Sequence, residues 1–247
     1  MIMTAEITKL AEILRAGSVV FFGGAGVSTE SGIADFRSES GLYAAKEVYG
    51  YSPEELISHT FFIKKPELFF RYYRENLISL TAKPNSAHLA LAELEKRKLL
   101  QAVITQNIDG LHQAAGSREV LELHGSNLRQ YCVKCGAKYS LEFVIKNEEI
   151  IPKCEKCGGT VRPEVVLYEE GLDEDVMSRS VKYIANAETL IVGGTSLVVY
   201  PAAGLLLYFL GKNLLLINKT STGYESEATL ASHAPIGEIF RAVMKIL

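Results

Sequence analysis

The sequence has few cysteines, few prolines and no large excess of charge of either sign. Seven prolines and a hydrophobic share of 48% exclude a collagen-like repeat and a disordered chain. Four cysteines in 247 residues are too few for a disulfide-dense scaffold. The chain has 26 basic and 29 acidic side chains, so no basic excess is present to release counterions. This balance argues against a dedicated nucleic-acid or membrane-surface binder. A chain of this length can bury one large core, or a large and a small domain.

Two segments are candidates for a targeting signal or a membrane span. Residues 1–10 contain Glu6 and Lys9 and lack a continuous apolar core, so we expect an amphipathic helix there and no secretion signal. Residues 190–211 are 22 residues without a charge, which is long enough for a membrane span. A Gly-Gly-Thr-Ser sequence and a proline interrupt this run, which predicts a strand, a polar turn and a short helix. We therefore expect a cytoplasmic protein without a membrane partner.

The four cysteines form two C-x-x-C pairs, Cys132 with Cys135 and Cys154 with Cys157, separated by 18 residues. Each pair runs into glycine, and four thiolates in this spacing can close a tetrahedral site, so we predict structural zinc. Disulfides are disfavoured in reducing cytosol, and a redox motif needs one such pair near a βαβ unit. Zinc ribbons also bind nucleic acid, but the mixed charge between the pairs provides no basic stripe.

Short runs of apolar residues, each followed by a polar turn with glycine or asparagine, recur along the chain. Strands that are apolar throughout are buried on both faces, which predicts an open α/β structure with a parallel sheet. A helical pattern at residues 88–96 precedes one of them. Ligands of such sheets bind beyond the carboxyl ends of the strands, where these turns lie. The predicted strands are residues 18–22, 101–105, 189–192 and 214–217.

Two segments interrupt this pattern. Residues 43–73 hold nine of the 22 aromatic residues in helical-looking stretches, and the cysteine module extends from about Ser126 to Val161. We therefore expect two domains. The large domain comprises residues 1–42, 78–125 and 162–247, and the small one comprises residues 43–77 and 126–161.

A glycine-rich loop, Gly24-Ala-Gly26-Val-Ser-Thr29, follows the first predicted strand, and we expect it to open a helix. Such glycines allow a backbone to approach a pyrophosphate, whose charge a helix N-terminus favours. The motif is an incomplete dinucleotide fingerprint, because Thr29 occupies the third glycine position and no acidic residue clearly ends a second strand. Taken alone, the loop is equally consistent with a tight strand-to-helix turn.

Further motifs accompany the loop. Gly24-Ala-Gly-Val-Ser-Thr-Glu-Ser-Gly-Ile-Ala-Asp-Phe-Arg37, Thr105-Gln-Asn-Ile-Asp109, His124-Gly125, the two cysteine pairs, Gly194-Thr-Ser-Leu197 and Ile217-Asn218 follow one another in the order seen in sirtuins. The chain thus resembles sirtuins, the NAD-dependent protein deacylases, from about residue 15 to its end. The resemblance implies a Rossmann-like large domain, a small domain of zinc ribbon plus helical module, and an active site in the cleft between them. Ala34 replaces a usual proline, and Tyr168-Glu-Glu170 replaces the Phe-Gly-Glu of many members.

The resemblance also implies roles for individual residues. His124 would be the general base, with Asn107 and Asp109 flanking the nicotinamide pocket as further catalytic residues. His112 ranks second and is expected to be a packed or orienting residue, and His59, His88 and His233 have no chemical context. Residues 165–168 would form an edge strand that pairs with the substrate: Val165, Val166, Leu167 and Tyr168. NAD would contact Gly24, Ala25, Gly26, Thr29, Ile33, Asp35, Phe36, Arg37, Gln106, Asn107, Ile108, Asp109, Gly194, Thr195, Ser196, Asn218 and Ile236. The metal ligands would be Cys132, Cys135, Cys154 and Cys157, holding Zn²⁺.

The expected reaction consumes NAD and an acetylated protein and yields free lysine, nicotinamide and O-acetyl-ADP-ribose. Family members that prefer succinyl or malonyl groups carry Tyr-x-x-Arg, whereas the matching positions here are Tyr73 and Asn76, so we expect uncharged acyl groups. Alternatives are ADP-ribosyl transfer to protein, removal of longer uncharged acyl groups, and a non-catalytic NAD sensor. The expected partner is a protein segment containing acyl-lysine, bound by a monomer.

Overall fold

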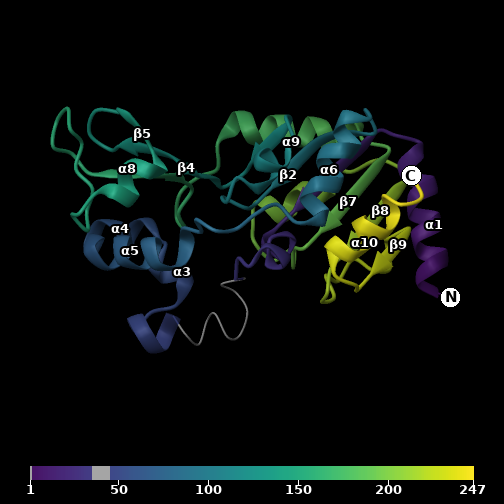
Figure 1. Cartoon of the computed structure of the whole chain (residues 1–247), viewed down its shortest axis with the longest axis horizontal. Helices are drawn as coiled ribbons and strands as arrows, with labels where there is room; N and C mark the ends of the chain where they lie inside the picture. The colour runs from purple at the N-terminus through teal and green to yellow at the C-terminus, as the bar shows by residue number, and fades with distance from the viewer. Residues whose placement is uncertain (1, 35–44) are drawn as a thin grey trace.

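Among residues 2–34 and 45–247, which the computed structural model describes, six parallel strands form the main sheet in the order β3-β2-β1-β7-β8-β9 (Figure 1). All four predicted strands are confirmed. Two edge strands of three residues each, β3 and β9, were not predicted. The strands are β1 (Val19–Gly23), β2 (Leu100–Thr105), β3 (Val120–Glu122), β7 (Thr189–Gly193), β8 (Asn213–Ile217) and β9 (Leu230–Ser232).

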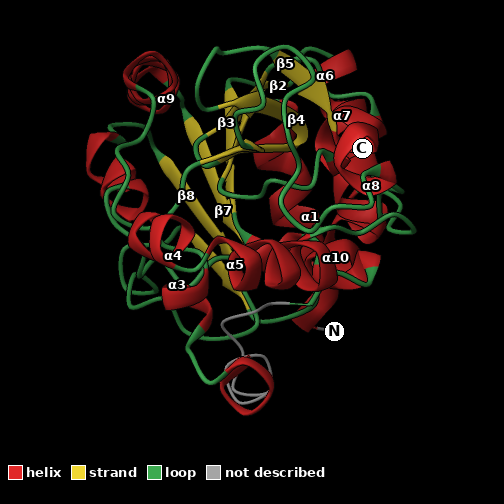
Figure 2. Cartoon of the chain, turned by 90° about the vertical axis from the view of Figure 1, so that its left-hand side faces the viewer, coloured by secondary structure: helices red, strands yellow, loops and turns green. Residues whose placement is uncertain are grey.

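Helices cover both faces of this sheet, as the uniformly apolar strands require. In β1, Val19 and Phe21 pack into a cluster with α1 (Ile2–Arg15), α6 (Ser86–Lys96) and α10 (Ile236–Val243). Val20 and Phe22 pack into a second cluster, with α9 (Glu174–Asn186) and the 3₁₀ helix η4 (Ala202–Tyr208). Figure 2 shows the strands between α9 on one side and α1 and α10 on the other.

The uncharged run at residues 190–211 divides as predicted into β7, a polar turn and η4. Within the described residues, every helix is too short or too polar to cross a membrane.

A second, antiparallel sheet of β4 (Gly125–Cys132), β5 (Lys138–Ser140) and β6 (Val161–Val165) lies at the other end of the molecule, beside α8 (Leu141–Lys146) (Figure 1). The aromatic segment lies next to it as short helices. These are α3 (Pro53–Leu56), α4 (His59–Lys64), α5 (Pro66–Tyr72) and a π-helical turn, η3 (Tyr73–Leu77). One hydrophobic cluster contains Phe69 and Phe70 from the helices and Val144 and Val161 from the cysteine module. The two interruptions of the α/β pattern therefore share a single core.

Candidate active site

The site lies where the strand order of the main sheet reverses. From β1 the chain proceeds to β2 and β3 on one side, and it later returns to β7 and β8 on the other. Gly23 at the end of β1 and Gly193 at the end of β7 are paired in register. Ligands of open α/β sheets bind in the crevice that such a reversal leaves at the carboxyl ends of the strands.

The glycine loop opens a helical segment, as expected, but this segment is of the 3₁₀ type and not an α-helix. It continues as two 3₁₀ turns, η1 (Ala25–Val27) and η2 (Thr29–Ser31), and ends at Gly32 in a left-handed conformation. The amides of Gly24 and Gly26 donate to the carbonyl oxygens of Gly193 (3.2 Å) and Gly194 (2.8 Å), so these amides do not point at a phosphate. A Cβ on Gly26 would lie 2.8 Å from the Cα of Gly194. These glycines therefore allow two loops to pack closely.

Contacts with the starts of two helices hold the loop in place. Asn85, which caps α6, donates through Nδ2 to the Val27 carbonyl oxygen (2.7 Å) and to Ser31 Oγ (3.0 Å). The carboxylate of Glu30 accepts the Gly237 amide (2.8 Å) in the first turn of α10. Neither contact was predicted, because each joins segments far apart in the sequence.

Ser28 links the loop to the predicted catalytic residues. Its Oγ donates to Asp109 Oδ2 (2.7 Å) and accepts from Asn107 Nδ2 (3.0 Å). The other carboxylate oxygen of Asp109 accepts the amide of Leu111 (2.8 Å), at the start of α7 (Leu111–Ala115). Ser28 is buried and lies within the glycine motif, but its sequence position alone did not indicate these contacts.

His124 follows β3 and is held in one tautomer. Its Nδ1 lies 2.9 Å from the Gln106 carbonyl oxygen, which can only accept a hydrogen bond. The neutral ring therefore carries its proton on Nδ1, and Nε2 is the basic nitrogen. Gln106 itself is fixed by its amide, which donates to the Gly23 carbonyl oxygen (3.0 Å), and by Nε2, which donates to Thr195 Oγ1 (3.1 Å).

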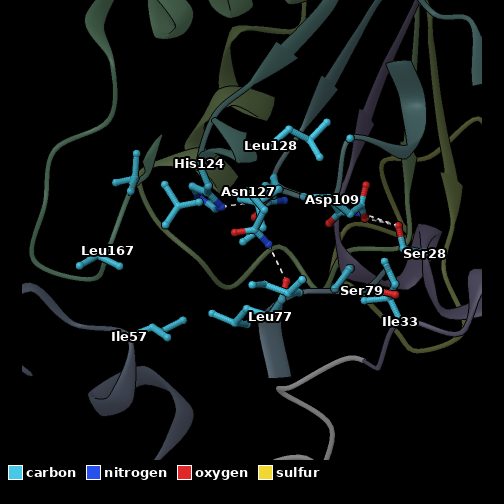
Figure 3. Close-up of a pocket in the computed structure, with 18 of the residues that line it drawn as sticks. Ser28, Ile33, Ile57, Leu77, Ser79, Asp109, His124, Asn127, Leu128 and Leu167 are labelled. Atoms are coloured by element: carbon cyan, nitrogen blue, oxygen red, sulfur yellow. Dashed lines mark hydrogen bonds between the residues drawn. The ribbon is translucent and has the colours of Figure 1, made fainter. Parts of the chain in front are cut away.

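A cavity of about 430 Å³ joins these groups (Figure 3). Its charged lining residues are Asp109, Glu169 and Glu170, and none of the described lining residues is lysine or arginine. The remaining walls are largely apolar. The cavity brings together the predicted residues Ala25, Ile33, Gln106, Asn107, Ile108, Asp109, His124, Val165, Val166, Leu167 and Tyr168.

The other predicted NAD-contacting residues that the structure describes lie outside this cavity. Thr195 and Asn218 follow the ends of β7 and β8, and Ile236 is buried at the start of α10, packed close to Gly193. Thr29 Oγ1 donates to the Gly26 carbonyl oxygen (3.0 Å) within its own loop. Asp35, Phe36 and Arg37 lie outside the described residues. The residues that do not line the cavity are Gly24, Gly26, Thr29, Gly194, Thr195, Ser196, Asn218 and Ile236.

The strand expected over residues 165–168 ends at Val165, where β6 stops. Beyond it, the amides of Val166 and Tyr168 donate to the carbonyl oxygens of His124 (2.9 Å) and Ile57 (3.1 Å), and that of Leu167 to Glu170 (2.8 Å). A peptide that pairs with this segment must therefore donate its amide groups to carbonyl oxygens of the segment, or displace these bonds.

Two carboxylates join this segment to the aromatic helices. Glu170 accepts from the buried Arg162 guanidinium (2.6 and 3.0 Å) and lies 2.8 Å from His59 Nδ1, so His59 has the chemical context that was not expected of it. Burial by itself would raise the pKa of Glu170, but hydrogen bonds from Arg162, His59 and the Leu167 amide outweigh it and hold the pKa at about 2. Glu169 has a φ of 76°, a left-handed conformation that favours glycine, and its carboxylate accepts the Thr60 amide (2.8 Å) in the first turn of α4.

His112 is a packed residue, which is one of the two roles expected of it. It is 1% exposed, and its ring centroid lies 4.7 Å from that of the buried His88. Burial, with a smaller contribution from His88, lowers the pKa of His112 to about 3, so its ring is neutral near pH 7. His233 Nδ1 lies 2.9 Å from the Asn218 carbonyl oxygen.

The residues that match Tyr-x-x-Arg differ in their surroundings. Tyr73 is buried, its Oη accepts from Gln130 (3.0 Å), and it does not line the cavity. Asn76 does line the cavity, and its Nδ2 donates to Tyr49 Oη (2.9 Å). Arg74 donates to carbonyl oxygens of the cysteine module, at Asn147 (3.2 Å) and Glu149 (2.8 Å).

The four cysteine sulfurs fit a zinc ion. All lie within 4.8 Å of one another, with 3.5 Å between Cys132 and Cys157 and 3.6 Å between Cys135 and Cys154. A tetrahedral ion with Zn–S bonds of about 2.3 Å requires sulfurs about 3.8 Å apart. A Cβ on Gly159 would lie 2.9 Å from Cys132 Sγ, so glycine permits this close approach.

The fold and the polar cluster at the strand ends define a Rossmann-like protein with a separate zinc module. The chain belongs to the Sir2 family, whose model matches residues 24–201. It is 57% identical to an NAD-dependent protein deacetylase of Clostridium acetobutylicum over 99% of this chain and 100% of that protein. A solved complex of Sir2 with a deacetylated p53 peptide and 3′-O-acetyl ADP ribose has a TM-score of 0.90 and 39% identity, with 98% of each chain covered. A complex of Sir2 with p53 peptide and NAD⁺ has a TM-score of 0.87 and 40% identity, covering 96% of this chain and 97% of the other.

Proposed function

We propose that this chain is an NAD-dependent protein deacetylase that converts acetyl-lysine in a protein segment to free lysine, with nicotinamide and O-acetyl-ADP-ribose as the other products. The observation that carries the proposal is the convergence of Asn107, Asp109 and His124 on one cavity at the switch point of the sheet. Membership of the Sir2 family and similarity to deacetylases over the whole chain agree with it.

The cavity suits the nicotinamide end of NAD. NAD supplies nicotinamide as a leaving group and a ribose carbon that the acyl oxygen can attack. Asn107 and Asp109 offer an amide and a carboxylate, which together can donate to and accept from a carboxamide. Ser28, bonded to both, fixes their orientation. The roles implied for Asp35, Phe36 and Arg37 remain part of the proposal, as do the NAD contacts outside the cavity.

His124 acts as the general base in this proposal. With its proton on Nδ1 directed at the Gln106 carbonyl oxygen, the ring can accept a ribose hydroxyl proton at Nε2. A positioned base of this kind contributes about 10²–10⁴-fold. The proton transfer frees the ribose oxygen to attack the acyl carbon, whose bond to the lysine nitrogen then breaks. The ring returns the proton to the departing amine, and a water molecule supplies the oxygen that completes O-acetyl-ADP-ribose.

Uncharged acyl groups are the proposed substrates. Asn76 stands where an arginine would pair with an acyl carboxylate, and the charged residues that line the cavity are acidic. The segment Val165, Val166, Leu167 and Tyr168 is the proposed site for the substrate backbone. We further propose a monomer in the cytoplasm, with the domain boundaries given above and with one structural zinc ion.

Mass spectrometry of the products tests this function. Purified protein with NAD and an acetyl-lysine peptide should yield deacetylated peptide and acetyl-ADP-ribose in equal amounts, and neither product without NAD. A peptide that gains the mass of ADP-ribose and keeps its acetyl group would show that the activity is ADP-ribosyl transfer and not deacetylation. Binding of NAD without any product would leave the sensor alternative.

A further inference from the structure

Glu169 has a backbone conformation that its side chain disfavours. Its φ of 76° lies in the left-handed region, where glycine is the usual residue, and many family members have glycine at this position. It directly follows the segment 165–168 that is proposed to hold the substrate backbone, and it lines the cavity. Residues other than glycine stay in this region only where surrounding contacts hold them, and such residues concentrate at ligand-binding segments. The conformation of Glu169 therefore calls for a contact that offsets its cost.

That contact is with the start of α4. The Glu169 carboxylate accepts the Thr60 amide (2.8 Å), and the carbonyl oxygen of the preceding residue, Tyr168, accepts the His59 amide (2.9 Å). These are the first two amides of α4, which have no partner within the helix, and the helix dipole favours a carboxylate beside them. Hydrogen bonding to Thr60 lowers the pKa of Glu169, so the carboxylate is charged near pH 7.

The same contacts fix the segment that faces the substrate. Tyr168 pairs with Ser58 in a parallel bridge, and its amide donates to the Ile57 carbonyl oxygen (3.1 Å). Within the described part of the chain, the Val166 carbonyl oxygen accepts no hydrogen bond, so it is available to an amide of a bound peptide. Figure 3 shows Leu167 and Ile57 at the end of the group opposite Ser28. The position of this peptide-binding edge therefore depends on how the segment is held against α4.

Loss of the Glu169 contact would loosen this edge without unfolding it. Glu170 still joins the far end of the segment to the buried Arg162 (2.6 and 3.0 Å), and Tyr168 keeps its backbone bonds. A peptide that binds a looser edge must order it, and that cost lowers affinity. NAD binding and the chemistry at His124 do not involve the contact.

We propose that Glu169 is a positioning residue for the substrate: by binding the Thr60 amide, its carboxylate holds the peptide-binding segment against α4 and raises the affinity for the peptide backbone. This inference rests on the proposed deacylase function. The competing role is a direct ion pair with a basic residue of the substrate, because the Glu169 side chain is exposed. A positioning role affects every peptide alike, whereas an ion pair affects only peptides that carry a cation near the acetyl-lysine.

Three variants of Glu169 separate its conformation from its contact. Glu169→Gln keeps the length and an accepting oxygen. Glu169→Asn tolerates the left-handed conformation but is too short to reach Thr60, and Glu169→Gly tolerates it without a side chain. In steady-state assays, the Asn and Gly variants should raise the KM for an acetyl-lysine peptide about three- to tenfold, as expected for loss of one hydrogen bond, with kcat and the KM for NAD within about twofold. Glu169→Gln should restore the peptide KM. The Tm of Glu169→Gly should stay close to that of the wild type, because relief of the disfavoured conformation offsets the lost bond.

Amide hydrogen exchange at Thr60 tests the contact without turnover. Protection of this amide should fall in Glu169→Gly and Glu169→Asn and persist in Glu169→Gln. Unchanged protection in the Gly variant, or an unchanged peptide KM where protection is lost, would overturn the inference. A rise in KM confined to peptides with lysine or arginine beside the acetyl-lysine would overturn it in favour of the ion pair. Absence of turnover by the wild-type protein would instead refute the proposed function, and fluorescence-anisotropy titration of the same peptide would then replace KM in the comparison of variants.

Discussion

A succinyl-lysine peptide brings a carboxylate into a cavity whose charged lining residues are Asp109, Glu169 and Glu170. With no lysine or arginine among the described lining residues, this carboxylate must lose water without gaining a cation. A desolvated charge pair in such a site is worth about 2–4 kcal/mol, so acetyl-lysine should exceed succinyl-lysine roughly 30- to 900-fold in kcat/KM.

Asn76→Arg should reduce this preference. Asn76 is exposed at its position on the cavity wall, so a longer side chain has room, although it would lose the bonds to Tyr49 Oη (2.9 Å) and the Tyr72 carbonyl oxygen (3.1 Å). Asn76→Gln is the matched neutral control. Parallel steady-state assays on acetyl- and succinyl-lysine peptides should show a gain on succinyl-lysine of at least tenfold in the arginine variant only. Equal turnover of the two peptides by the wild-type protein would refute this reasoning.

Three further predictions concern Ser28, the cysteine cluster and Glu170. Ser28→Ala removes a 2.7 Å bond to Asp109, worth about 1.5–3 kcal/mol, and should lower kcat/KM roughly 10- to 150-fold; activity within twofold of wild type would contradict the role given to Ser28. Cys154→Ser removes a buried ligand and should lower both the zinc content measured by metal analysis and the Tm, whereas one retained zinc per chain at the wild-type Tm would argue against a four-cysteine site. Glu170→Gln leaves the buried Arg162 without its carboxylate. Because the folded pKa of Glu170, about 2, lies below its ordinary 4.5, the stability that its ionised carboxylate contributes is present above pH 4.5 and is lost as the pH falls towards 2. Urea unfolding should therefore show a gap between wild type and Glu170→Gln at pH 7 that closes in acid, and a pH-independent gap would contradict this assignment.

Much of the sheet was predictable because its central strands are apolar on both faces and end in glycine or asparagine. The short edge strands β3 and β9 were missed, since three residues are too few to show a pattern. The sequence grouped the two inserted segments into one small domain, but it did not predict the packing of their shared core. It depends on contacts such as Phe70 with the cluster that includes Val144, which no local periodicity reports.

The catalytic candidates were found because their motifs occur in a characteristic order, whereas the residues that orient them were not. Ser28 and Asp109 are 81 positions apart, and their bond follows from the folding of two loops onto one another. The 3₁₀ form of the helix expected after Gly24 was missed for a related reason. Asn85 and Glu30 hold that segment in 3₁₀ turns by contacts to distant helices. The contact between Glu169 and Thr60 likewise emerges only from the packed structure.

The central claim assigns His124 to a step after nicotinamide has left, and Asn107 and Asp109 to the pocket that nicotinamide leaves. Exchange of labelled nicotinamide into NAD, measured beside deacetylation with acetyl-lysine peptide, separates the two steps. His124→Ala should lose deacetylation by about 10²–10⁴-fold and retain exchange, while Asp109→Asn should lose both. Loss of exchange in His124→Ala, or unimpaired deacetylation in that variant, would contradict the account.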